Sequence, residues 1–192
     1  MSRIVYYSKM FQAVPHLAQV ERQLPGTFVS SRRSTINAVR NLYPAMPAEL
    51  ESRWLGLLYK GKQSLSEADV IVTGSPYRRL LEPYAAKKCM VFHGTYMMLS
   101  RSALMANAHY DLLCVIGPRM QQMIGRFADE IAINSVSTGF LPFGEYPERS
   151  SAHRHAVLCA FGLNPDWQTI VYTPSRRGVG SWDFLATQLV SN

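Results

Sequence analysis

The stretch Cys89-Met-Val-Phe-His-Gly-Thr-Tyr96 offers the best starting point for predicting the fold of this chain. Two lysines precede its apolar run, and the run stops at His93 and Gly94, as expected of a buried strand that ends in a loop. His93 is therefore predicted at the carboxyl end of a strand, where ligands gather in open α/β sheets. Most histidines near a strand end are ordinary loop residues, so the surrounding pattern must decide whether His93 is functional.

Strand patterns and helical patterns alternate along the first three quarters of the chain. The predicted strands are Ile4 to Tyr7, Thr27 to Ser30, Asp69 to Thr73, Met90 to Phe92, Asp111 to Ile116 and Ile131 to Val136. Helical spacing follows them: Leu17, Val20 and Leu24 before Pro25-Gly26; Ile36, Val39 and Leu42 after a cap at Ser34-Thr35; Pro44 to Ala68, interrupted near Gly61; Ser100 to Ala108; and Met120, Ile124 and Phe127 after Pro118. This alternation predicts an α/β fold, a doubly wound, Rossmann-like parallel sheet.

Pro142 to Ser151 is rich in turn formers and is the predicted domain boundary. We expect a Rossmann-like domain over residues 1–145, followed by a linker and the opening of a second α/β domain over residues 146–192. The second part is predicted to hold helices at Ala152 to Phe161 and Ser181 to Val190 and a strand at Gln168 to Tyr172. These elements cannot bury a core alone, so the second domain is expected to be truncated here; alternatively, the tail docks on the first domain.

The composition is that of a globular protein, with 47% hydrophobic and 17% charged residues in 192. The formal charge of +7 implies an attraction for anions without choosing among them. The basic pairs Arg32-Arg33, Arg78-Arg79, Lys87-Lys88 and Arg176-Arg177 fall at predicted element ends and form no continuous run. This spacing favours an anion-facing rim over a nucleic-acid-binding arm, and no nucleic-acid partner is expected.

Cys89, Cys114 and Cys159 stand in apolar contexts and have no CxxC spacing. They are interpreted as small buried side chains in a reducing compartment, which predicts neither a disulfide framework nor a cysteine zinc site. No apolar window reaches the length of a membrane span, and the amino terminus enters a strand directly. We expect a cytoplasmic protein that contacts an anionic membrane surface only peripherally, on the inner face of the cell membrane.

Four predicted strand ends converge on one crevice: Ser8-Lys9, Gly74-Ser75, His93-Gly94-Thr95 and Gly117-Pro118. A histidine in such a crevice can take a proton from a hydroxyl near neutral pH, and an adjacent glycine lets substrate approach the backbone. Ser75, Gly94, Thr95 and Gly117 are therefore predicted to bind substrate around His93.

A second cluster, Thr173-Pro-Ser-Arg-Arg177, follows the predicted strand at Gln168 to Tyr172. Guanidinium groups fork onto phosphate oxygens, so Ser175, Arg176 and Arg177 suit a donor diphosphate. The chain has no dinucleotide-binding or P-loop glycine pattern, no nucleophile elbow and no paired-carboxylate signature. Few carboxylates stand near the predicted strand ends, which argues against divalent-metal chemistry, so we expect no metal. We also expect no cofactor.

These motifs, in this order, resemble the CDP-glycerol glycerophosphotransferases of bacterial teichoic-acid synthesis, a family of the GT-B glycosyltransferase type. The resemblance covers about residues 66–182. It includes Val91-Phe92-His93-Gly94-Thr95 and the strand and proline-led helix of Leu112 to Phe127. Further along the chain it includes Thr138-Gly139-Phe140-Leu141-Pro142, and Phe161-Gly-Leu163 before Ile170-Val-Tyr-Thr-Pro-Ser-Arg176. The sequence departs from the family at Phe92, where a tryptophan is usual, and at Met97-Met98, where a lysine often stands.

The resemblance implies a transferase that moves glycerol phosphate from a CDP-activated donor to a hydroxyl of a glycan or polyol-phosphate acceptor. By this resemblance His93 is the catalytic base for the acceptor hydroxyl, and Ser175 and Arg176 face the donor diphosphate. The family's carboxyl-terminal half is absent, so the chain alone is expected to turn over nothing. Two alternatives stay open: a GT-B glycosyltransferase or epimerase that uses a nucleotide sugar, and a non-catalytic binding domain of the same fold.

Overall fold

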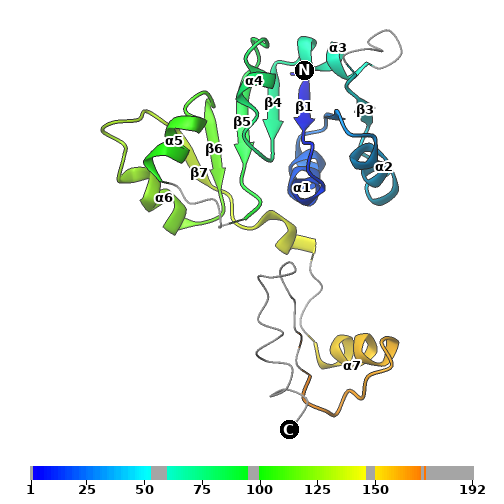
Figure 1. The fold of residues 1–192 in the computed structure, drawn as a ribbon. Helices are drawn as coiled ribbons and strands as arrows, with labels where there is room; N and C mark the ends of the chain where they lie inside the picture. The colour runs from blue at the N-terminus through cyan, green and yellow to red at the C-terminus, as the bar shows by residue number, and fades with distance from the viewer. Residues whose placement is uncertain (1, 53–59, 95–99, 146–149, 170, 172–192) are drawn as a thin grey trace, which may run out of the picture. The chain divides into compact units, whose positions relative to one another are not determined.

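The computed structural model describes residues 2–52, 60–94, 100–145, 150–169 and 171. The chain divides into two compact units, Met1–Tyr146 and Pro147–Asn192, and each unit is described by itself. The first unit holds the whole parallel sheet, and Figure 1 shows its strands as blue to green arrows with helices between them.

The first unit begins with two strand–helix repeats and a short edge strand. Its elements in this part are β1 (Ile4–Tyr7), the 3-10 helix η1 (Phe11–Ala13), α1 (Val14–Gln23), β2 (Thr27–Ser30), α2 (Arg33–Leu42) and β3 (Ala48–Leu50). Pro15 stands in the first turn of α1, where its missing N–H leaves no hydrogen bond unmade. Helix α1 ends just before Pro25-Gly26, as the sequence predicts.

The remaining elements of this unit continue the alternation. They are α3 (Gly61–Glu67), β4 (Val70–Thr73), α4 (Arg78–Leu81), β5 (Lys87–Val91), α5 (Arg101–Asn107), β6 (Leu112–Val115), α6 (Pro118–Gly125), β7 (Ser135–Ser137) and the 3-10 helix η2 (Leu141–Glu145). Ser100 caps α5 by accepting a hydrogen bond from the Ala103 N–H at 3.3 Å.

The seven strands form one parallel sheet in the order β3-β2-β1-β4-β5-β6-β7. The predicted doubly wound, Rossmann-like α/β fold is therefore confirmed. The strand order reverses between β1 and β4, whose carboxyl ends carry Ser8 and Gly74. That reversal is the topological switch point, and a crevice for ligands forms there in this class of fold.

The sheet buries both of its faces, because successive side chains of each strand point to opposite sides. Tyr6 and Phe28 lie on one face and pack with α1 and α2. Tyr7, Val29 and Ile71 lie on the other face, which α3, α4, α5 and α6 cover; all five side chains are fully buried. The strands consequently read as nearly continuous apolar runs in the sequence.

The prediction of a helical Pro44 to Ala68 is wrong over its first part. Ala48–Leu50 is β3, which pairs with β2, and the Phe28 N–H donates to the Pro47 carbonyl at 2.7 Å. Backbone pairing with β2 outweighs the helical spacing of the apolar residues. Gly61 does not interrupt a helix either: it opens α3, where an added Cβ would lie 2.8 Å from the Leu50 carbonyl oxygen. Trp54, Leu57 and Leu58 lie outside the described residues.

Two smaller predictions also differ from the structure, and one short helix was not predicted. Ser34-Thr35 does not cap α2, which begins at Arg33; the Thr35 hydroxyl instead donates to the Lys9 carbonyl at 3.2 Å. The predicted strand Ile131 to Val136 is shifted, because β7 spans Ser135–Ser137 and Ile131 is buried in the core before it. Helix α4 was not predicted, since four residues are too few to show a helical period.

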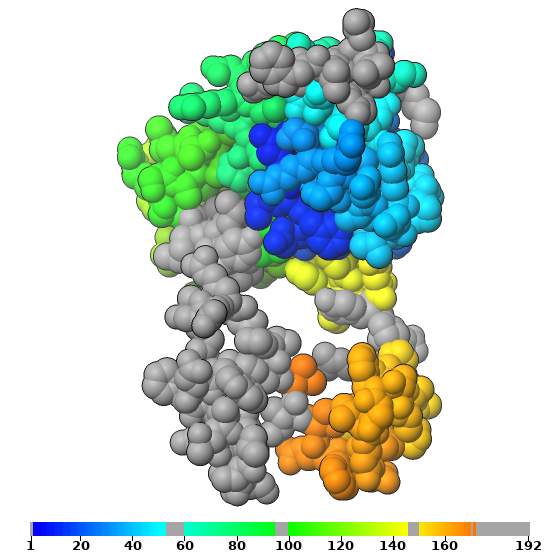
Figure 2. Space-filling view, turned by 45° about the vertical axis from the view of Figure 1, so that its right-hand side comes forward, coloured from blue at the N-terminus to red at the C-terminus, as the bar shows by residue number. Residues whose placement is uncertain are grey.

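The second unit contains α7 (Ser151–Ala160), which confirms the predicted helix. Ser150 caps it by accepting the His153 N–H at 3.0 Å, and Gly162 ends it at a φ of +70°. The predicted strand is not seen at Gln168, Thr169 or Val171, while Ile170 and Tyr172 lie outside the described residues. The predicted helix at residues 181–190 also lies outside the described residues. The residues of this unit that are orange in Figure 2 are mostly exposed.

The cysteine prediction holds only in part. Cys89 and Cys114 are half-buried on neighbouring strands, and burial raises the pKa of both thiols, that of Cys114 to about 11. Cys159 is exposed, which contradicts its predicted burial, because Leu158 is the buried side chain of α7. In the part of the chain that the structure describes, no helix has the length and apolar character needed to span a membrane.

Candidate functional site

The candidate site lies at the carboxyl edge of the sheet, around the switch point between β1 and β4. The loop after β1 is bonded to the loop after β4, since the Lys9 N–H donates to the Tyr77 hydroxyl at 3.0 Å and the Ser8 Oγ lies 3.4 Å from that oxygen. The Lys9 Nζ lies 6.0 Å from the centre of the Tyr77 ring. The site is thus built from strands that are distant in sequence and adjacent in the sheet.

Ser8 has a structural role in this edge. It is fully buried, its Oγ donates to the Met10 carbonyl at 2.9 Å, and it accepts the Met10 N–H at 3.0 Å. Such local side-chain bonds favour a tight turn over a continued strand. The turn sends the chain from β1 into η1 and α1, and it leaves Lys9 partly exposed at the edge.

Tyr110 fixes the loop that follows β4. Its hydroxyl lies 2.8 Å from Thr73 Oγ1, donates to the Ser75 carbonyl at 3.1 Å, and receives the Tyr77 N–H at 3.3 Å. Burial of the ring raises the pKa of Tyr110 to about 12, so the hydroxyl keeps its proton at neutral pH. One phenol therefore holds both ends of the Ser75–Tyr77 loop.

Gly74 allows the start of α1 to approach the end of β4. A Cβ at this position would lie 2.2 Å from the Ala13 Cβ, closer than real Cβ atoms approach. The absence of a side chain at Gly74 thus decides how closely η1 and α1 pack on the switch point. The sequence prediction that Gly74-Ser75 borders the crevice agrees with this geometry.

His93 follows β5 and is half-buried, with its Nε2 3.4 Å from the Ser75 Oγ. The structure therefore brings together two of the predicted site residues. Burial lowers the pKa of His93 below its ordinary value, and a backbone hydrogen bond opposes that shift. The imidazole is consequently neutral at pH 7 and able to take up a proton.

His16 belongs to the same neighbourhood and was missed by the sequence reasoning. Its ring centre lies 6.2 Å from that of His93 and 4.9 Å from that of Phe140. It is 3% exposed, and its buried Nδ1 has no hydrogen-bond partner among the described residues. Burial, followed by repulsion from His93, lowers the pKa of His16 to about 4. Its place in the first turn of the helix after β1 was the available signal, since such turns face the carboxyl edge.

The positive charges divide between the two edges of the sheet. Arg32-Arg33 follows β2 and Arg78-Arg79 lies two strands away, after β4; both pairs thus stand with Lys9 on the carboxyl side. Lys87-Lys88 instead opens β5 at the opposite edge, where the Lys87 Nζ lies 2.9 Å from an Asp111 carboxylate oxygen. The predicted rim is therefore present at the candidate site for two of the four basic pairs.

Gly94 and Gly117 are the other predicted site residues that the structure describes. Gly117 is the N-cap of α6 after β6, at the same edge, and no atom of the described residues lies within 4 Å of an added Cβ. Gly94 is half-buried next to His93. Thr95, Ser175, Arg176 and Arg177 lie outside the described residues. Within the described ranges, no group of three histidine, cysteine or acidic side chains is placed to hold a metal ion.

Fold and edge together define the class of protein: a doubly wound α/β protein with a histidine at the switch-point edge of its sheet. No protein-family model matches the chain, and no curated protein matches it. A solved structure named as a UDP-N-acetylglucosamine 2-epimerase from Listeria monocytogenes is 12% identical, with a TM-score of 0.33. The alignment covers 88% of this chain and 48% of that one, so the chain spans about half its length.

Proposed function

We propose that this chain is the acceptor-side part of a transferase that moves a nucleotide-activated group to a hydroxyl. The observation that supports the proposal is a neutral His93 beside the Ser75 hydroxyl at the carboxyl edge of a doubly wound sheet. A neutral imidazole is suited to accept the proton of an acceptor hydroxyl. The Ser75 hydroxyl is suited to orient either the imidazole or the incoming alcohol.

The finer form of the proposal is glycerol phosphate transfer from CDP-glycerol, as the order of motifs suggests. The acceptor oxygen attacks the phosphorus that carries glycerol, and the bond from that phosphorus to the oxygen shared with CMP breaks. His93 Nε2 takes the proton of the acceptor hydroxyl, and CMP leaves with the electron pair of the broken bond. The products are the glycerophosphoryl ester of the acceptor and CMP.

Charge at the same edge supports an anionic substrate. Lys9, Arg32-Arg33 and Arg78-Arg79 follow the strands that flank or border the switch point. Positive charge at one edge raises the local concentration of phosphorylated substrate and steers its approach. Ser175, Arg176 and Arg177 are proposed as further donor-phosphate ligands. A polyol-phosphate or glycan acceptor and peripheral contact with an anionic membrane are part of the same proposal.

The test is a donor-turnover assay on the protein expressed from the complete reading frame, with the 192-residue chain assayed beside it. We expect acceptor-dependent release of CMP from CDP-glycerol, and loss of that release in His93→Ala. Release from a UDP-sugar alone would overturn glycerol phosphate transfer in favour of a nucleotide-sugar glycosyltransferase or epimerase. Full activity of His93→Ala would make His93 a structural residue, and absence of turnover with every donor would favour a binding domain.

A further inference from the structure

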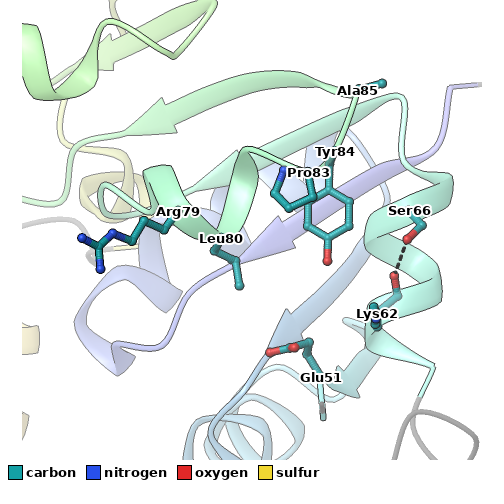
Figure 3. Close-up of a pocket in the computed structure, with 8 residues that line it drawn as sticks. All are labelled: Glu51, Lys62, Ser66, Arg79, Leu80, Pro83, Tyr84 and Ala85. Atoms are coloured by element: carbon teal, nitrogen blue, oxygen red, sulfur yellow. Dashed lines mark hydrogen bonds between the residues drawn. The ribbon is translucent and has the colours of Figure 1, made fainter.

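A separate hollow of about 620 Å³ opens on the face of the sheet that α3 and α4 cover (Figure 3). Glu51, which follows β3, and Lys62 and Ser66 of α3 line one side. Arg79 and Leu80 of α4 and the ring of Tyr84 line the other. Its volume is within the range of small-molecule sites. None of the residues predicted to bind substrate around His93 lines it.

Glu51 is the unusual residue of this hollow. It is 8% exposed, and within the described ranges no hydrogen bond or ion pair joins its carboxylate to another residue. Its backbone is fixed, because the Glu51 N–H donates to the Ser30 carbonyl at 2.8 Å. Figure 3 shows the carboxylate and the Tyr84 hydroxyl directed into the same space. A carboxylate that is little exposed and lines a hollow suits a ligand that supplies hydrogen-bond donors.

The charges around Glu51 decide which donors fit. Lys62 lines the same hollow and repels an ammonium group, so neutral hydroxyls are the better partners for the carboxylate. Lys62 and Arg79 are exposed, and no ion pair to either is found in the described part of the chain. Figure 3 shows Lys62 on the same side as Glu51 and the Arg79 guanidinium directed away from both. The ammonium group of Lys62 favours an anion with several acceptor oxygens, and a phosphate meets that need.

We infer that this hollow binds a small phosphorylated sugar or polyol. Its hydroxyls donate to the Glu51 carboxylate, its phosphate accepts from Lys62, and its carbon skeleton lies against Leu80 and the Tyr84 ring. The inference is independent of the proposed transfer reaction, because it uses neither His93 nor a nucleotide.

The test is calorimetric titration of the whole chain with glucose 6-phosphate, and with glucose and inorganic phosphate as separate probes. We expect a dissociation constant below about 1 mM for glucose 6-phosphate and at least about tenfold weaker binding of either fragment. Glu51→Leu keeps the volume and removes both acceptors, while Lys62→Gln removes the ammonium group. Each variant should weaken binding about tenfold or more, since each removes a charge-assisted hydrogen bond.

Neighbouring residues that do not line the hollow provide matched controls. Glu82→Leu and Arg78→Gln should bind glucose 6-phosphate like the original chain, and so should His93→Ala. Circular dichroism verifies the fold of each variant, and Glu51→Gln replaces Glu51→Leu if the latter is unfolded. Absence of binding up to about 10 mM overturns the inference. Equal weakening by the control variants also overturns the inference. Loss of binding in His93→Ala overturns it as well, because it would show that glucose 6-phosphate binds at the carboxyl edge of the sheet.

Discussion

Gly74→Ala is the sharpest stability test of the switch-point geometry. An added Cβ would lie 2.2 Å from the Ala13 Cβ, whereas real Cβ atoms essentially never approach within 3.0 Å, so the backbone must yield by about 0.8 Å (3.0 Å less 2.2 Å). Overpacking of this kind costs about 1–3 kcal/mol, and the reduced freedom of the unfolded chain returns about 0.4–1 kcal/mol. We expect a net loss of about 1–2 kcal/mol in the free energy of unfolding.

Gly117→Ala is the matched control, because none of the described atoms lies within 4 Å of its added Cβ and its φ of −172° is extended backbone. It should change the free energy of unfolding by less than about 0.5 kcal/mol, since the gain from the unfolded chain offsets a poorer N-cap. Urea unfolding followed by circular dichroism measures both variants. If Gly74→Ala is as stable as Gly117→Ala, the described approach of α1 to β4 is wrong.

Three further outcomes follow from the described contacts. Tyr110→Phe should lower the free energy of unfolding by about 1–3 kcal/mol in urea titrations, because the buried Thr73 hydroxyl and the Ser75–Tyr77 loop lose their hydrogen-bond partner. An unchanged midpoint of unfolding would show that the Tyr110 hydroxyl does not stabilise this loop. Folding lowers the pKa of His16 from its ordinary 6.5 to about 4, so the neutral imidazole contributes fully to stability above pH 6.5. That contribution is lost as the pH falls toward 4, by at most about 1.4 kcal/mol per pH unit. His16→Phe should reduce this loss, and equal pH dependence of the free energy of unfolding in the variant and the original chain would refute the prediction. Gly162→Ala should destabilise the end of α7 by about 1 kcal/mol because its φ is +70°, and faster amide exchange in α7 would verify this.

Much of the sheet could be predicted because its strands are buried on both faces. Runs such as Ile4 to Tyr7 and Thr27 to Ser30 are apolar and bounded by turn residues, and the structure places both strands as predicted. Edge strand β3 could not be found in this way. Its three residues are only partly buried, and hydrogen bonds to β2, which are absent from the sequence pattern, determine its conformation.

The site was predictable only where a residue stands at a strand end. His93 and Ser75 lie two residues after the ends of β5 and β4, and the parallel sheet places the His93 Nε2 3.4 Å from the Ser75 Oγ. His16 lies on a helix, where a buried side chain reads as part of the core, so its proximity to His93 depends on how α1 packs. Tyr110 acts on residues 33 to 37 positions away, and only tertiary structure creates that contact.

The rate of CMP release from CDP-glycerol by His93→Gln tests the central claim most directly, in the protein expressed from the complete reading frame. His155→Gln, on the exposed surface of α7, is the control. A catalytic base contributes about 10²–10⁴-fold to a rate, so the account predicts a loss of that size for His93→Gln and an unchanged rate for His155→Gln. A His93→Gln rate within about twofold of the original would contradict it.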